Sequence, residues 1–199
     1  MPITEPLTRG HQLFLQRLLA AHVMTDDDAK KLHEELNDTR CKTLEQSLEV
    51  MNKQLSAGFG LEVATVNLNG TRHHAIINPH SDDGIAKASF STIYTPHERA
   101  FIRLMLEKIV EEDACTRMDL INLRLNLKDP YKQIPIDAAE YCIDSLISEC
   151  WLTPKSQDRR KSMNAEYELG PRTYLELSSL LTDSFGMPKD ELPQMIFHR

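Results

Sequence analysis

Residues 134–172 constrain the fold more than any other part of the sequence. Apolar or small residues recur there at helical spacing, and Trp151 and Leu152 then begin a short extended run. A polar, basic loop follows over 155–164, and residues 165–169 are predicted to form a return strand before a Gly-Pro pair. A helix, a strand, a loop and a strand in this order are typical of the second half of a winged-helix domain.

Three helices are predicted in the first part of the chain. Residues 10–23 place apolar side chains on one face, which is typical of a buried helix. Thr25 is followed by three aspartates, which favour a helix start because the hydroxyl can cap free N–H groups and the carboxylates complement the helix dipole. A third helix begins near Leu44 and is expected to end at two glycines.

A two-residue hairpin turn is predicted at Asn69 and Gly70. Asn-Gly between two extended runs, here 61–68 and 72–77, is the strongest short-range signal for such a turn. Two adjacent histidines in the second run could be taken for a metal or catalytic pair. Because adjacent strand residues face opposite sides of a sheet, a structural or surface role is favoured for them.

The second half begins with a capped helix. Thr95, Pro96 and Glu98 match the N-cap, the first helical position and the acid of a capping box. The helix that follows is apolar around much of its circumference, so it is either central to its domain or covered on a second side by a partner. A short helix over 118–127 and a closing helix over 174–185 are also predicted.

Both halves therefore repeat three helices followed by a two-stranded wing. The predicted fold class is mainly α with small β-hairpins (α+β), built as two winged-helix domains in tandem. The expected organisation is residues 1–78 for the first domain, 79–93 for a linker, 94–186 for the second domain and 187–199 for a connector. Two prolines in the last segment indicate a semi-extended chain.

Charge and motifs exclude several classes of protein. The net charge of −7 and the pI of about 5.6 argue against general nucleic-acid binding. No apolar run approaches the about 20 residues of a membrane span, so no membrane partner is expected. Phosphate-binding glycine loops, nucleophile elbows and close sets of metal ligands are absent, so no catalytic, cofactor-binding or metal-binding residue is predicted. The four cysteines are far apart and are expected to be reduced, mostly buried thiols.

A local basic cluster lies in the loop of the second wing. Four cations against one aspartate give this loop a net charge of +3. The cations are candidates for weak, sequence-independent phosphate contact, and a loop that is merely solvated is the alternative. The third helix of each half is acidic, which argues against reading of the major groove. The candidate phosphate contacts are Lys155, Arg159, Arg160 and Lys161.

Apolar surface is the other candidate for function. The first helix and the capped helix together carry more apolar residues than one core face needs, which indicates binding to a partner protein. Each of these residues could equally belong to the core of its own domain. The candidate interface residues are Phe14, Leu18, Phe59, Phe101 and Met105.

Several segments resemble the non-SMC element 1 family of the SMC five/six genome-maintenance complex. They are HQLFLQRLLAAHVMTDDDAKKL, the hairpin LEVATVNLNGTRHHAIIN, the capped helix TPHERAFIRLMLEKIVE, and the late segments ECWLTPK and YELGPRTYLEL. The resemblance extends from about residue 10 to residue 185 and rests on the order and pattern of these segments.

The resemblance implies a tandem winged-helix protein of the kite type, which pairs with the MAGE-type non-SMC element 3 and with the kleisin, non-SMC element 4. It also implies a place in the nucleus, close to the SMC ATPase heads, and a role in DNA repair and recombination. In this family a RING-like zinc module, associated with E3 ubiquitin-ligase activity, follows the second winged-helix domain.

The last residues of the chain fall where that module is expected to begin. Zinc and ligase activity are therefore implied only for a longer protein, and no zinc ligand is assigned to any position here. The alternative function is a tandem winged-helix regulator that contacts DNA through the basic wing over 155–161.

Overall fold

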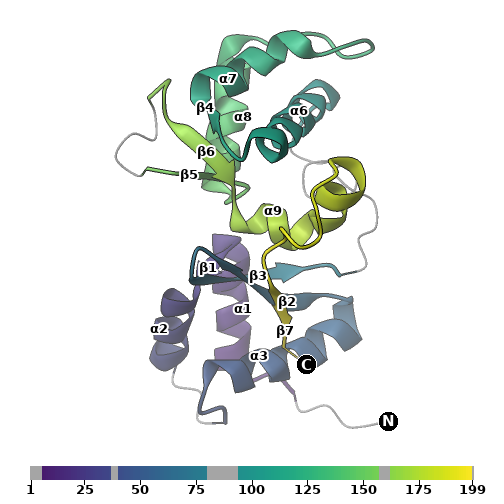
Figure 1. Ribbon diagram of the computed structural model, residues 1–199. Coiled ribbons are helices and arrows are strands. Elements are labelled where there is room, and N and C mark those ends of the chain that lie inside the picture. Colours follow the sequence, from purple (N-terminus) through teal and green to yellow (C-terminus); the bar gives the residue numbers. More distant parts are fainter. Residues whose placement is uncertain (1–5, 37–39, 80–93, 157–161, 199) are drawn as a thin grey trace. The chain divides into compact units, whose positions relative to one another are not determined.

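The computed structural model describes residues 6–36, 40–79, 94–156 and 162–198, and the chain divides into two compact units (Figure 1). The first unit comprises Met1–His80 together with Pro193–Arg199, and the second comprises Ser81–Leu192. No helix within the described ranges is both long enough and apolar enough to cross a membrane. The linker expected over 79–93 lies, apart from its first residue, outside the described residues.

The first unit consists of three helices and an antiparallel sheet. Its helices are α1 (Arg9–Ala21), α2 (Asp26–Leu36) and α3 (Leu44–Phe59). Its strands are β1 (Met24–Thr25), β2 (Glu62–Leu68), β3 (Thr71–Ile77) and β7 (Met195–Phe197), in the order β1-β3-β2-β7. Apolar side chains from all three helices pack together in one core with Val63 of β2.

Capping and turn residues set the ends of these elements. The Thr25 hydroxyl accepts a hydrogen bond of 3.2 Å from the backbone N–H three residues later, which confirms the expected start of α2. Gly60 ends α3 in the left-handed conformation, with a φ of 66°. Asn69 and Gly70 have φ angles of 50° and 81°, and a type I′ hairpin turn requires such positive angles at both positions.

The second unit also combines helices with a small antiparallel sheet. Its helical segments are α6 (Pro96–Glu112), α7 (Arg117–Asn122), the 3-10 helix η1 (Leu123–Asn126), α8 (Ile136–Ser148), α9 (Pro171–Glu176) and the π-helical turn η3 (Leu180–Ser184). Its strands are β4 (Cys115–Thr116), β5 (Leu152–Pro154) and β6 (Glu166–Leu169), in the order β4-β6-β5. The predicted helix and the two predicted strands are therefore confirmed as α8, β5 and β6, while residues 157–161 of the predicted loop lie outside the described residues.

Each unit has a helix, a short strand, two further helices and a hairpin, and the short strand pairs with the second strand of the hairpin. This is the element order of a winged helix, and the predicted fold class, mainly α with small antiparallel sheets, is confirmed. The short strands β1 and β4 are not predictable from sequence, because two residues cannot show an alternating pattern. In both strands the second residue is a threonine. Its hydroxyl caps the next helix by accepting a hydrogen bond from a backbone N–H in the first turn of that helix.

Two predicted helices differ from the structure. The short helix expected over 118–127 is α7 continued by the 3-10 helix η1. The closing helix expected over 174–185 is divided into α9, which begins at Pro171, and η3. Proline at a first helical position has the right φ angle and lacks an N–H group that would have no partner there, which explains the earlier start.

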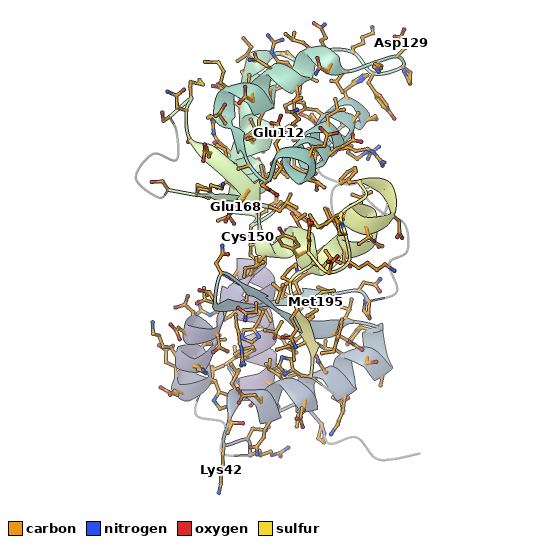
Figure 2. All side chains as sticks on the ribbon, viewed as in Figure 1. Lys42, Glu112, Asp129, Cys150, Glu168 and Met195 are labelled. Carbon is orange, nitrogen blue, oxygen red and sulfur yellow. The ribbon has the colours of Figure 1, made fainter. Side chains whose placement is uncertain are left out.

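The last residues depart furthest from expectation. A semi-extended connector was predicted over 187–199, but Pro193–Arg199 belong to the first unit. There β7 pairs antiparallel with β2, so that Ile196 lies opposite Thr65 (Figure 2 labels Met195, where β7 begins). This pairing joins segments that are distant in sequence, so no local sequence pattern predicts it.

Candidate functional site

The basic wing falls largely outside the described residues. Arg159, Arg160 and Lys161 lie there, so the structure does not place them. Lys155 is exposed, and its backbone N–H donates a hydrogen bond of 3.0 Å to the carbonyl of Glu166, which extends the pairing of β5 with β6. Contact between these four cations and phosphate remains a prediction.

Helix α8, the third helix of the second unit, carries an acidic outer face. Asp137 and Asp144 are exposed, and Tyr141 is 64% exposed. Asp144 accepts a hydrogen bond of 2.8 Å from Arg117, whose side chain is buried, so this carboxylate also compensates an interior cation. Carboxylates repel phosphate, whereas an exposed aromatic ring suits contact with protein.

A buried arginine secures the junction between α8 and α9. The guanidinium of Arg172 lies 4.2 Å from the ring centroid of Trp151, and it forms ion pairs with Glu149 at 3.2 Å and Glu176 at 2.7 Å. The indole N–H of Trp151 also donates to Glu149, at 3.1 Å. These contacts compensate the buried cation, so Arg172 has a structural role.

The five predicted interface residues divide into two groups. Phe14 and Leu18 are buried in the core of the first unit, and Phe101 and Met105 are buried in the core of the second. These four are not available to a partner, and the expectation for them is corrected: periodicity identifies an apolar face but not what covers it. Phe59 differs, because it is 77% exposed at the end of α3.

Polar side chains of the first unit form a hydrogen-bonded chain, the Asp26–His198 chain. Asp26 Oδ1 lies 3.0 Å from His74 Nε2. Thr65 Oγ1 lies 2.8 Å from His74 Nδ1 and 2.7 Å from His198 Nε2. The Lys30 ammonium lies 2.7 Å from the other oxygen of Asp26. The chain thereby joins the start of α2 to the residue that follows β7.

A carboxylate, an imidazole and a hydroxyl in contact could be compared with a catalytic triad. Thr65 is only 1% exposed and His74 only 2%, so neither can reach a substrate in solution. Burial lowers the pKa of His74, although Asp26 acts in the opposite direction, and burial also lowers the pKa of His198. Both imidazoles are therefore neutral at neutral pH, and the Asp26–His198 chain holds β7 on β2.

Of the structural and surface roles expected for His74, its buried hydrogen bonds support the structural one. No sequence pattern indicates a role for Thr65 or His198, because the two residues contact each other across a long separation in sequence. The only local signal is that threonine and histidine lie among the apolar residues of the hairpin strands. That signal does not identify a third partner.

The residues that the structure describes do not fit a zinc site. Cys41, Cys115 and Cys142 are buried, and Cys150 is half-buried. Burial raises the pKa of the Cys115 and Cys142 thiols to about 12, which opposes the thiolate form that binds metal. In the described ranges no three histidine, cysteine or acidic side chains gather closely enough to hold an ion. Zinc chemistry therefore cannot be assigned to these residues.

Exposed apolar side chains are the remaining candidate for function. In the first unit they include Leu13, Leu19, Phe59 and Phe197. In the second unit they are Met118, Leu125, Tyr131, Ile136, Tyr141 and Met163. Several of those in the second unit lie on α7, η1 and α8, where exposed aromatic and methionine side chains favour protein contact.

Comparison with known proteins identifies the family. The model of the Nse1 non-SMC component of the SMC5-6 complex matches residues 11–177, a range that includes most of both units. No curated protein matches the chain. A chain of a solved "Nse1-Nse3-Nse4 complex" is similar in fold, with a TM-score of 0.73 and 21% sequence identity over 91% of this chain and 76% of that chain. The protein belongs to the family of the Nse1 non-SMC component of the SMC5-6 complex.

Proposed function

We propose that this protein is a scaffold subunit of the SMC5-6 complex that binds a MAGE-type Nse3 subunit and a kleisin Nse4 subunit. The observation that carries the proposal is the family match, which extends over most of both units. The similar solved structure contains Nse1, Nse3 and Nse4 together, which supports these partners. In this proposal the protein acts in the nucleus, in DNA repair and recombination.

The surface chemistry supports binding rather than catalysis. Large apolar side chains such as Phe59 and Tyr141 are exposed, while the polar groups that could resemble a catalytic site are buried. Aromatic residues of this kind commonly anchor protein interfaces. A tandem winged-helix subunit of the kite type would use such surfaces to pair with a second winged-helix protein.

Mixing the chain with an Nse3 subunit tests the proposal. Size-exclusion chromatography with light scattering should show one species with the summed mass of both proteins. Two separate monomers at micromolar concentration would exclude pairing by this chain.

Phe59→Glu provides a sharper test, because Phe59 is so exposed that the change should leave the fold intact. The variant should weaken pairing by about tenfold or more, as loss of an aromatic interface anchor does. Gln16→Glu is the control for the added charge, since Gln16 is an exposed polar position on α1 of the same unit. If both variants pair with Nse3 as the wild type does, Phe59 is not part of the interface. The scaffold role itself would then still be tested by the mixing experiment.

A second candidate function is DNA contact by the basic wing, which the charge of its loop favours. Contact by Lys155, Arg159, Arg160 and Lys161 would make binding weaken with salt, with a log–log slope of roughly −3.6 if each contact contributes about −0.9. Replacing Arg159, Arg160 and Lys161 by alanine should remove most of that slope. Binding to duplex DNA that does not depend on salt would contradict this role.

Ubiquitin-ligase activity, in this proposal, belongs to a RING-like zinc module joined to this chain. The described residues supply no zinc ligand set for such a module. The two winged-helix units would then position the module within the complex. Ligase assays that compare the 199-residue chain with a chain carrying the module should detect ubiquitin transfer only in the second case.

A further inference from the structure

The second unit has a groove on its surface that the functions above do not use. It lies between α6 and the segment from η1 to the start of the following loop, and its volume is about 520 Å³. We call it the α6 groove. The residues that define it are Ala100, Arg103, Leu104, Leu127, Lys128 and Tyr131.

One wall of the α6 groove is a second apolar stripe of α6. Phe101, Met105 and Ile109 mark the first stripe, which is buried in the core of the unit. Ala100 and Leu104 lie on a different side of the helix, are only half-buried and line the groove. The apolar excess that the sequence of α6 shows is therefore explained in part by a surface outside the core.

The opposite wall is held in place by contacts with the start of α6. The backbone N–H of Lys132 donates a hydrogen bond of 3.2 Å to His97 Nδ1. The rings of His97 and Tyr131 meet edge to face, with their centroids 6.1 Å apart. The groove is thus formed before any ligand binds, and this reduces the entropy that binding must overcome.

The rim of the α6 groove is weakly basic in a chain that is acidic as a whole. Arg99, Arg103 and Lys128 line it against Glu107 and Asp129, which gives a local charge of +1 in a chain of net charge −7. Asp129 is labelled in Figure 2 on the loop that forms the second wall. The Arg103 guanidinium lies 5.3 Å from the ring centroid of Phe185, which orients this cation at the rim.

We propose that the α6 groove binds an acidic, amphipathic segment of a partner protein. Large apolar side chains of that segment, three or four residues apart, would contact Ala100, Leu104 and Leu127. Its carboxylates would pair with Arg103 and Lys128. The α6 stripe from Pro96 to Glu107 is about 16 Å long, which corresponds to about three helical turns of a bound segment.

A synthetic peptide tests this proposal without knowledge of the natural partner. The probe is a fluorescein-labelled peptide in which pairs of leucines recur at helical spacing among glutamates, and fluorescence anisotropy with the full chain measures binding. The affinity should fall as salt increases, because ion pairs at an exposed rim are screened. The same peptide with lysine in place of each glutamate should bind at least about tenfold more weakly.

Two variants locate the binding to the α6 groove. Leu104→Glu and Arg103→Glu should each weaken peptide binding by about tenfold or more, since they remove the apolar contact and reverse a rim charge. Arg17→Glu, an exposed position on α1, is the matched control for the charge change and should bind the peptide as the wild type does. Far-UV circular dichroism and the fluorescence of Trp151 verify that each variant is folded.

The proposal is overturned if the acidic peptide does not bind at low salt, if the lysine peptide binds equally well, or if both groove variants bind normally. His97→Ala should also weaken binding, because it releases the loop wall without altering a contact residue. The inference is independent of the pairing proposed above. If the chain does not pair with Nse3 but still binds the peptide, the result therefore contradicts only the proposed function.

Discussion

Asn52 shows how one buried side chain can connect three segments of the first unit. Its amide nitrogen donates to the carbonyl of Val63 at 2.9 Å and to that of His198 at 2.8 Å, and its amide oxygen accepts from the N–H of Val63 at 2.7 Å. The residue therefore joins α3 to β2 and to the end of β7. No apolar side chain could replace these bonds, because backbone groups would be left without partners.

Asn52→Ala is predicted to lower the free energy of unfolding by about 2–3 kcal/mol, since buried backbone groups lose their partners. Urea unfolding followed by circular dichroism measures the change. Lys53→Ala is the control at the adjacent exposed position and should alter stability by less than about 0.5 kcal/mol. A loss below about 1 kcal/mol for Asn52→Ala would indicate that water replaces the amide.

The histidines of the Asp26–His198 chain predict a loss of stability in mild acid. Burial lowers the pKa of His74 and of His198 below 6.5, so the unfolded chain binds protons there that the folded chain does not. Stability is therefore fully present above about pH 6.5 and decreases as the pH falls, by up to about 1.4 kcal/mol per pH unit for each histidine, until the folded groups titrate. Burial raises the pKa of Asp26, but hydrogen bonds and electrostatic interactions with Lys30 and His74 together outweigh burial and lower this pKa, so the contribution of Asp26 is lost only at pH values below about 4.

Urea unfolding at a series of pH values tests this linkage. The double variant His74→Gln, His198→Gln should show a shallower dependence on pH between about 7 and 5 than the wild type. His22→Asn is the control, because His22 is exposed at the end of α1 with a φ of 61°, which asparagine tolerates. Equal slopes for the double variant and the wild type would assign the acid sensitivity to other groups.

Among the elements, β5 and the start of α9 approach each other at Gly170. Its N–H donates a hydrogen bond of 2.8 Å to the carbonyl of Trp151. A Cβ atom added there would lie 2.3 Å from the carbonyl oxygen of Cys150, so only glycine fits (Figure 2 labels Cys150). The close approach fixes the junction between the wing and the closing segment.

Gly170→Ala is predicted to destabilise the second unit by about 3 kcal/mol or more, because the clash is with backbone atoms that cannot move aside. Gly58→Ala is the matched control: nothing lies within 4 Å of the added Cβ, and the site is helical. That change should raise stability by about 0.5–1 kcal/mol. Thermal unfolding of both variants, monitored by Trp151 fluorescence and circular dichroism, measures these changes. Equal unfolding midpoints for the two variants would contradict the prediction that the Cβ atom clashes at Gly170.

At the scale of the whole molecule, the fold is expected not to depend on a metal. The described residues contain no cluster of ligands, and the thiols of Cys115 and Cys142 are held in the protonated form by burial. Treatment of the 199-residue chain with a strong chelator should therefore leave its thermal unfolding midpoint unchanged. A lower unfolding midpoint that zinc restores would show a structural zinc site and contradict this prediction. A chain joined to a RING-like module provides the positive control.

Much of the fold could be predicted because its signals are local. The caps at Thr25 and Thr95, the turn at Asn69 and Gly70, and the periodicity of residues 134–150 each depend on neighbours within a few positions. The family resemblance rests on the same local segments, and the family match agrees with it. The order of the longer helices and of the hairpin strands in both units is thus determined by short-range patterns.

The tertiary structure alone decided which surfaces are free and where distant segments meet. The sequence makes Phe101 a candidate for the core and for an interface, and its burial shows that it belongs to the core, whereas Leu104 on the same helix lines a groove. The pairing of β7 with β2, and the contact of Thr65 with His198, depend on hydrogen-bonding partners far apart in the chain. The periodicity of a sequence shows that one face of a helix or strand is apolar. Burial and long-range pairing depend on which distant segments pack against that face, so only the folded chain reveals them.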